Sequence, residues 1–324
     1  MDTSDLSSSL AAEVWAASRE VLPLPGDGRT AARFESLAEM GARDLCLAKL
    51  VEPHHDATAI LTELGAAGAG PDMLWAVWAA EPPHARLRAL RRGEGWVLTG
   101  TKAFCSGAAL VTHALITAEA EDGARLFAVD VASGRSSGEL EVAPPSWSGV
   151  GMRRAGTRSL DVRDVPAVPV GGPGDYTGRS GFWHGAVGVA ACWLGGARAV
   201  AGLLESSARR RDLDLHALAH LGTSTSLLDA ATAHLDAVAD RIDRDPGDVS
   251  DRAHRDAQSV RATVVATAEA VIIRTAHALG PAPLAFDAEH AGRVADLSVF
   301  IRQHHAERDL ADLGRLVVGP PEHP

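Results

Sequence analysis

The sequence predicts an α+β fold with N-terminal helices, a middle antiparallel β-barrel or sandwich, and a C-terminal four-helix bundle. Three observations predict this fold. The hydrophobic period is helical at both ends of the chain and changes in the middle to short segments, several of which alternate. No helical pattern separates those segments, which argues against a parallel nucleotide-binding sheet. Four long helical patterns then follow one another, with loops between them.

The first part, residues 1–70, has a helical pattern. Leu10, Val14 and Val21 fall on one face, and Trp15 and Leu22 fall on the neighbouring face. The segments AARFESLAEMGARDLCLAKL and HDATAILTELGAA continue the helical period, and the linker GAGPD ends it.

The middle part, residues 71–175, has a strand pattern. Turn signals such as RRGEG and EDG separate its short segments, which are LWAVWAAE, ARLRAL, WVLTGTKAF, HALITAEA, RLFAVDV and SLDVRDV. Strands at this spacing predict an antiparallel barrel or sandwich.

The last part, residues 176–324, predicts the bundle. Loops rich in Pro, Gly and Asp, such as RDPGDVSD, separate four long helices. Their expected spans are Phe182–Arg209, Leu215–Ile242, Asp251–Leu279 and Glu289–Val317.

Composition limits the possible partners and the compartment. The chain has 324 residues and a formal net charge of −11, which argues against a nucleic-acid partner. No run appears apolar enough to cross a bilayer, because glycines and Arg198 interrupt the best one, GAVGVAACWLGGARAVAGLL. The only cysteines are Cys46, Cys105 and Cys192, whose spacing suggests neither a disulfide framework nor a metal site. We therefore expect a cytoplasmic protein with no bound metal and no membrane partner.

Two adjacent histidines stand near the end of the chain, in VFIRQHHAERDLADLG. His304 follows Leu297 and Ile301 at helical spacing, so it continues a row that otherwise looks buried. Two interpretations stay open for His304 and its neighbour His305. Either the histidine is a core residue with a satisfied partner, or it faces a pocket and is functional.

Several segments, in one consistent order, resemble those of a known family. One segment, GEGWVLTGTKAFCSGA, resembles the acyl-CoA dehydrogenase segment G-x-x-W/Y-x-L-x-G-x-K-x-F/W-x-[ST]-x-[GA]. A second segment, AVWAAEPP, is similar to a degenerate form of that family's T-E-P strand. GVGMRRAGTRSLDVRDVPAVP is similar to that family's G-[MI]-R strand pair. The resemblance extends from about Leu45 to Gly319 and implies a divergent, short member of the acyl-CoA dehydrogenase-like flavoproteins.

The resemblance implies a flavin cofactor, FAD or alternatively FMN, held by the β-domain and the bundle. Trp78 and Ala80 would lie near the pyrimidine edge of the flavin. Phe104, Cys105 and Ser106 would cover its other side, with the Ser106 hydroxyl and backbone N–H as donors. A flat apolar slot with a few donors is what tunes a flavin.

The resemblance also implies contacts across a homodimer or homotetramer. Arg209 would reach the pyrophosphate of the partner's flavin, although a solvated helix end explains its charge equally well. Gly280 lies in HALGPAP, which stands where the family has an adenine-contacting Q-x-x-G-G-x-G.

The family's usual base is missing from this sequence. Alignment of the last helix puts His304 where the dehydrogenases carry a glutamate, and the alternative glutamate position falls near Gly185, beside His184. A histidine can act as a base near neutral pH. Flavin monooxygenases on the same fold carry a histidine in the last helix, where it hydrogen-bonds the hydroperoxide or the substrate.

Three functions follow from the resemblance. The first expectation is an FAD-dependent oxidoreductase that forms a CH–CH double bond in an acyl thioester, with His304 or His305 as base. The second is a flavin-dependent monooxygenase acting on a small molecule, and the third is a non-catalytic relative.

Overall fold

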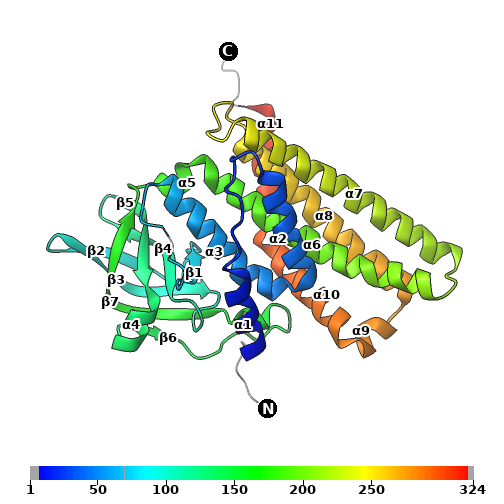
Figure 1. Ribbon diagram of the computed structural model, residues 1–324, viewed down its shortest axis with the longest axis horizontal. Coiled ribbons are helices and arrows are strands. Elements are labelled where there is room, and N and C mark those ends of the chain that lie inside the picture. The colour runs from blue at the N-terminus through cyan, green and yellow to red at the C-terminus, as the bar shows by residue number, and fades with distance from the viewer. Residues whose placement is uncertain (1–6, 69, 320–324) are drawn as a thin grey trace. The chain divides into compact units, whose positions relative to one another are not determined.

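A computed structural model of the chain describes residues 7–68 and 70–319 (Figure 1). The described residues form two compact units. Of the described residues, the first unit contains 7–22, 49–68, 70–149 and 153–182, and the second contains 23–48, 150–152 and 183–319.

The first unit contains the β-sheet and the helices around it. Its helices are α1 (Ser8–Ala17), most of α3 (Leu45–Glu63), α4 (Val131–Ser137) and α5 (Asp175–Gly178), with a short 3₁₀ turn at Arg153–Ala155. Its strands are β1 (Trp75–Trp78), β2 (Leu87–Arg92), β3 (Gly95–Cys105), β4 (His113–Ala120), β5 (Gly123–Asp130), β6 (Leu140–Val142) and β7 (Arg158–Val170).

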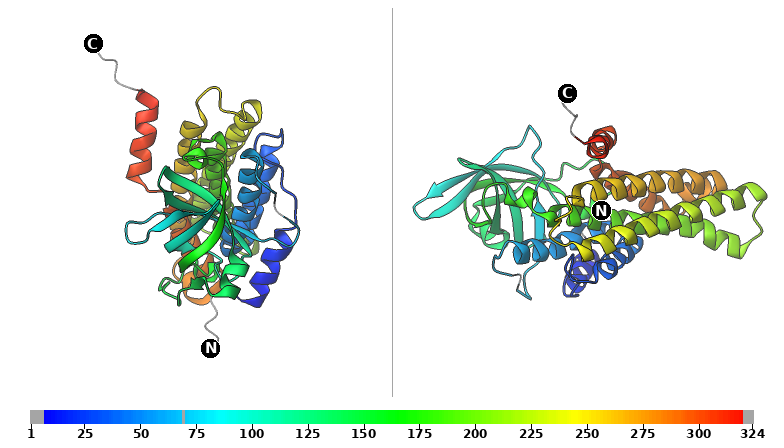
Figure 2. Two further views of the ribbon diagram at one scale, coloured as in Figure 1. Left: turned by 90° about the vertical axis from the view of Figure 1, so that its left-hand side faces the viewer. Right: turned by 90° about the horizontal axis from the view of Figure 1, so that it is seen from above.

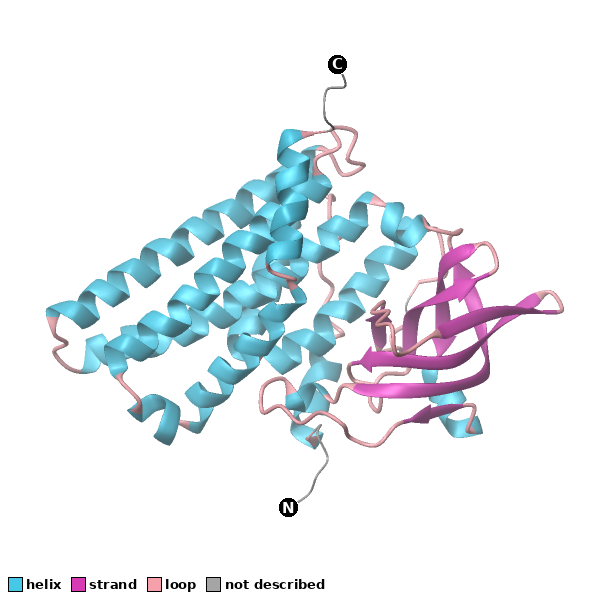
Figure 3. Ribbon diagram, turned by 180° about the vertical axis from the view of Figure 1, so that it is seen from behind, coloured by secondary structure: helices cyan, strands magenta, loops and turns pink. Residues whose placement is uncertain are grey.

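The strands close into a barrel (Figure 3). The pairing runs β4-β2-β3-β7-β5 and returns from β5 to β4, while β1 and β6 are added to β4 and β7. The expected α+β fold with a middle β-barrel is confirmed. The barrel differs from the expected antiparallel arrangement in two pairings. Strand β4 pairs in parallel with β1, where Trp75 lies opposite His113, and with β2, where Glu119 lies opposite Arg88.

Helix α3 supplies one face of the core of the first unit. Ile60 and Leu61 are buried against Trp75, Leu115 and Leu126 of the barrel. Each such side chain contributes roughly 1.5–3 kcal/mol when it is fully buried. Packing of this kind anchors α3 on the strands that carry the candidate site residues.

The second unit is helical. It contains α2 (Thr30–Arg43), nearly all of α6 (Ser180–Arg210), α7 (Leu215–Arg244), α8 (Ala253–Leu279), α9 (Ala282–Phe286), α10 (Ala288–Phe300) and α11 (Glu307–Val318). Helices α7 and α8 run side by side (Figure 2). Their antiparallel register is marked by His234 with Thr263 at 3.0 Å and by Arg241 with Asp256 at 2.6 Å.

Glycines allow α2 and α6 to approach closely. A Cβ atom on Gly41 would collide with the backbone of Cys192, and one on Gly195 would collide with the carbonyl of Ala38. The glycine-rich stretch of α6 is therefore the contact surface for α2, and it is placed inside the second unit.

Two described helices, α6 and α8, are long and apolar enough to cross a membrane. By length and composition, the expectation that no such segment exists is therefore wrong. The most apolar stretch of α6 is 72% buried, as in the core helix of a globular bundle, whereas that of α8 is 33% buried. Length and composition alone are weak support for a membrane span.

The helix expected over Glu289–Val317 is interrupted, so that prediction is wrong. Helix α10 ends at Phe300, a 3₁₀ turn covers Ile301–Gln303, and His304 is extended with φ −86° and ψ 123°. Ala306 then has a φ of 46° before α11 begins at Glu307. The apolar period continues across this break, which is why periodicity alone did not reveal it.

Candidate functional site

The end of β3 presents an aromatic ring on a strained turn. The register of β3 against β7 shifts between Lys102 and Cys105, and Phe104 in that bulge has a φ of 57°. A positive φ is unfavourable for a bulky side chain and costs on the order of 1–3 kcal/mol. Phe104 is nevertheless 52% exposed, so the strained backbone displays a flat apolar surface.

Trp78 and Ser106 are brought together next to Phe104. The buried Trp78 indole Nε1 donates to the Ser106 carbonyl at 3.1 Å. Pro53, Ala76 and Val77 line the same small hollow as Trp78, Phe104 and Ser106. Lys49 also lines this hollow, whose volume of about 20 Å³ has room for about one water molecule and not for a planar ring.

The expected donors at Ser106 are only partly available. Its backbone N–H donates to the Phe104 carbonyl at 3.1 Å, so it is already engaged within the turn. Its hydroxyl pairs with the Thr157 hydroxyl at 2.9 Å. Because one hydroxyl donates in such a pair, the other keeps its own hydrogen. One O–H donor therefore remains for a ligand.

Ala80 and Cys105 lie apart from the hollow beside Trp78. Ala80 is exposed and lines a different hollow, shared with Lys102. Cys105 is fully buried, with Sγ 3.5 Å from the Lys102 carbonyl oxygen, and burial raises the pKa of its thiol. The structure therefore gives no support to a contact between the Cys105 thiol and a cofactor.

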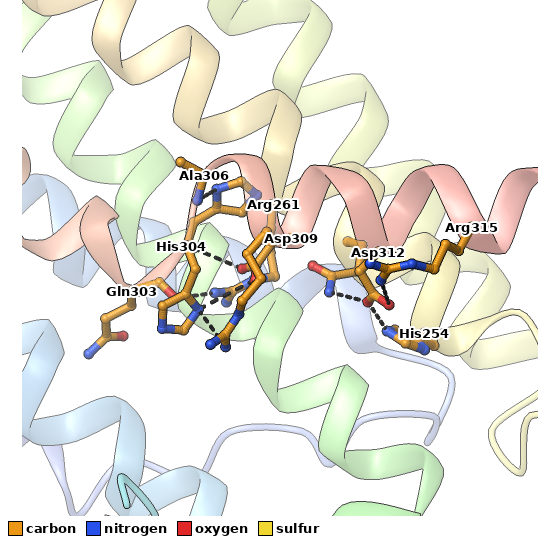
Figure 4. A network of polar contacts seen from close by, with 11 residues as sticks. His254, Arg261, Gln303, His304, Ala306, Asp309, Asp312 and Arg315 are labelled. Atoms are coloured by element: carbon orange, nitrogen blue, oxygen red, sulfur yellow. Dashed lines mark hydrogen bonds and ion pairs between the residues drawn. The ribbon is translucent and has the colours of Figure 1, made fainter. Parts of the chain in front are cut away.

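In the second unit, His304 occupies the break before α11 (Figure 4). Its side chain is buried, with a residue exposure of 5%. The Ala306 N–H donates to Nδ1 of His304 at 3.2 Å, while Nε2 is buried without a hydrogen-bond partner among the described residues. Burial lowers the pKa of His304 below its ordinary value.

This geometry assigns the tautomer of His304. A backbone N–H can only donate, so Nδ1 must carry the lone pair and a neutral ring must carry its proton on Nε2. His304 is thus a buried, neutral imidazole with an N–H donor that the described protein does not satisfy. An unsatisfied buried donor costs about 1–3 kcal/mol unless water or a ligand accepts its hydrogen bond.

Arg261 holds the turn that leads into His304. Its guanidinium donates to the Gln303 carbonyl at 3.0 Å and to the Ala186 carbonyl at 3.1 Å, and it lies 4.7 Å above the ring of Trp193. The bond to Gln303 fixes the residue that immediately precedes His304 (Figure 4). The role of Arg261 was not predicted from the sequence, because the local sequence pattern does not distinguish Arg261 from a surface arginine.

The start of α11 is fixed by two aspartates. Asp309 accepts from the His305 backbone N–H at 2.9 Å. Asp312 accepts from His254 Nε2 at 2.7 Å and from Gln258 Nε2 at 2.9 Å, both on α8 (Figure 4). His254 is itself stacked on Trp183, with ring centroids 3.7 Å apart. The backbone that supplies the Ala306 N–H is therefore anchored on both sides.

The other predicted residues of this unit are exposed or structural. The His305 side chain is 55% exposed, and its Nδ1 lies 3.4 Å from the Asp309 carboxylate. The Arg209 side chain is 77% exposed and pairs with Glu205 one turn earlier. Gly280 ends α8 with φ 70° and ψ −163°, a conformation essentially restricted to glycine. A role for Arg209 or Gly280 across a homodimer or homotetramer stays a prediction.

Comparisons with known proteins identify the fold. No family model matches the chain, and no curated protein matches it in sequence. Among solved structures, KijD3 in complex with FMN and a dTDP-amino-keto sugar is similar with a TM-score of 0.79 and 19% identity, covering 97% of this chain and 84% of the other. TdsC from Paenibacillus sp. A11-2, in complex with FMN and indole, gives 0.77 and 18%, covering 89% and 83%.

A third similar structure comes from Mycobacterium smegmatis and is assigned provisionally to the acyl-CoA dehydrogenases. Its TM-score is 0.71 with 18% identity, and the match covers 96% of this chain and 97% of the other. Structural similarity at such low sequence identity shows the fold alone and does not show which reaction the protein catalyses. The chain therefore has the fold of the acyl-CoA dehydrogenase-like flavoproteins, as the resemblance in its sequence predicted.

Proposed function

We propose that the protein is a flavin-dependent oxidoreductase that transfers oxygen to a small molecule, with His304 as a hydrogen-bond donor at the reacting atoms. The observation that carries this proposal is the buried Nε2–H of His304, which has no partner among the described residues. Such a donor stabilises an oxygen atom that gains negative charge during the reaction.

The residues of the first unit fit a flavin. The exposed Phe104 ring offers a flat apolar surface, and the Ser106–Thr157 hydroxyl pair offers one free donor. A reduced flavin, when bound, supplies the electrons that activate molecular oxygen. KijD3 and TdsC, two proteins of similar fold, were crystallised with FMN. TdsC is named a dibenzothiophene monooxygenase, which supports the same class of reaction here.

Dehydrogenation of an acyl thioester is the alternative, and the geometry of His304 favours it less. A base must offer a lone pair to the substrate proton. In His304 the only lone pair of the neutral ring lies on Nδ1, where it accepts from Ala306. Use of His304 as a base would require loss of that hydrogen bond or a change of tautomer. A donor role requires neither change.

Three variants of His304 test the role directly. The experiment would titrate the protein anaerobically with oxidised and photoreduced FMN and FAD, then add ¹⁸O₂ with indole as a trial substrate. Incorporation of ¹⁸O into product would be measured by mass spectrometry. His304→Gln keeps an N–H donor, so we expect it to retain activity within about tenfold. His304→Leu removes the donor and is expected to lose about 10²–10³-fold.

The same variants identify the alternative. Octanoyl-CoA would be added anaerobically to the protein with bound FAD. If it bleaches the flavin in the wild type and in His304→Glu but not in His304→Gln, then His304 acts as a base and the donor role is refuted. Failure to bind flavin in either redox state would refute the proposed function as a whole. Flavin affinity and thermal midpoint of each variant would be measured first, so that a folding defect is not mistaken for a chemical one.

A further inference from the structure

Lys102 is a buried amine held in one orientation inside the barrel. It lies on β3, is 3% exposed, and is one of only two lysines in the sequence. Its Nζ donates to both the backbone carbonyl and the hydroxyl of Thr117 on β4, each at 2.8 Å. Among the described residues Nζ makes no third hydrogen bond. A tetrahedral nitrogen with two donated hydrogens keeps one further position, which is a lone pair when the amine is neutral.

Lys102 lines a hollow of about 630 Å³ in the first unit. Strands β2 and β4 share only the pair of Arg88 and Glu119, and Glu119 lines the hollow. Its charged lining residues besides Lys102 are Glu81, Arg86, Glu119 and Glu121. These residues leave an acidic excess around the amine.

We propose that Lys102 is a covalent attachment site for small uncharged or cationic aldehydes, which the hollow admits and the amine binds as an imine. The lone pair of Nζ adds to the carbonyl carbon, and the carbonyl oxygen then leaves as water with both hydrogens of the amine. No oxidant or reductant is needed. The imine nitrogen then takes up one proton from solvent, and this new N–H can donate to the Thr117 carbonyl as the amine did before.

The burial of Lys102 supports this reactivity. Burial lowers the pKa of Lys102 to about 8, although the negative charge of Glu81 opposes that shift. At pH 8 about one half of such an amine is neutral, against about 0.4% for an ordinary lysine, which is a ~100-fold difference in nucleophile. Desolvation is a known means of activating a lysine for imine formation.

The charge of the hollow sets the ligand class. With Lys102 neutral, Arg86 faces three carboxylates, those of Glu81, Glu119 and Glu121. An aldehyde that bears a phosphate is repelled by this excess, whereas an uncharged aldehyde is not.

Reductive trapping tests the proposal on the intact chain. The wild-type protein would be incubated with propionaldehyde and cyanoborohydride from pH 6 to pH 10, and each lysine-containing peptide quantified by mass spectrometry. Lys49, the other lysine, is the internal reference. We expect the trapping rate at Lys102 to exceed that at Lys49 by ~10–100-fold at pH 8 and to be half-maximal near pH 8. Pyridoxal phosphate is expected to react at least about tenfold more slowly at Lys102.

A matched variant keeps the result interpretable. Lys49→Arg keeps the positive charge at that position and leaves Lys102 as the only lysine, so a retained signal assigns the reaction to Lys102. Equal labelling of both lysines, a half-maximal rate above pH 10, or no adduct at Lys102 would each overturn the proposal. The readout needs no flavin, so it is independent of the proposed function.

Discussion

Loss of the Asp312 carboxylate should release α11 from α8. Asp312 accepts hydrogen bonds from His254 at 2.7 Å and Gln258 at 2.9 Å, and its side chain is 33% exposed. Each bond contributes about 0.5–1 kcal/mol at a partly solvated position, so Asp312→Ala weakens docking by about 1–2 kcal/mol. That change raises the opening equilibrium of α11 by ~5–30-fold.

Hydrogen exchange followed by mass spectrometry measures this opening. We expect the amides of α11 and of Ala306 to exchange ~5–30-fold faster in Asp312→Ala, while the middle of α8 is unchanged. Since the Ala306 N–H sets the tautomer of His304, the variant should also lower the rate of oxygen transfer without changing flavin affinity. Glu307→Ala removes an exposed carboxylate from the same helix and is the control.

The reasoning would be refuted by unchanged exchange in α11 with normal folding. Equal acceleration throughout the second unit would also contradict it, because Asp312 would then support the whole bundle instead of one helix. The pH dependence gives a second test. The hydrogen bond from Gln258 lowers the pKa of Asp312. The hydrogen bond from His254 and the charge of His254 lower it further. Its contribution is therefore present above the unfolded-state pKa and is lost as the pH falls through the lower, folded-state value.

Two further predictions concern packing and the buried amine. Gly195→Ala places a methyl group against the Ala38 backbone and should destabilise the protein by about 2 kcal/mol or more. Gly202→Ala on the same helix meets open space and should stabilise the protein by up to about 1 kcal/mol. Urea unfolding midpoints compare the two variants, and equal effects would contradict the close contact between the helices. Because the folded-state pKa of Lys102 is about 8 and its ordinary value is 10.5, the unfolded chain binds more protons between these values. Wild-type stability should therefore rise by at most about 3 kcal/mol from pH 8 to pH 10.5 relative to Lys102→Met, and parallel pH profiles would show that the amine is not perturbed.

Periodicity was sufficient to place most elements, because local hydrogen bonding and burial of one face are repetitive properties. The strand expected in HALITAEA coincides with β4, His113–Ala120, and the helix expected over Leu215–Ile242 lies within α7, Leu215–Arg244. The motif around Gly93–Ala108 likewise located Trp96, Lys102 and Phe104 on one strand and its terminal turn. The family resemblance depended on the order of such elements, and the structure retains that order.

The sequence by itself therefore determined the architecture and which residues deserved scrutiny, His304 among them. Tertiary structure alone decided what those residues can do. The break at Ala306 has no signature in the apolar period, yet it directs an N–H onto Nδ1 of His304 and so makes the ring a donor. Likewise, Thr117 lies 15 residues from Lys102 and meets it only when the barrel closes. The protonation state of a buried group depends on partners brought together by folding, and linear spacing does not encode them.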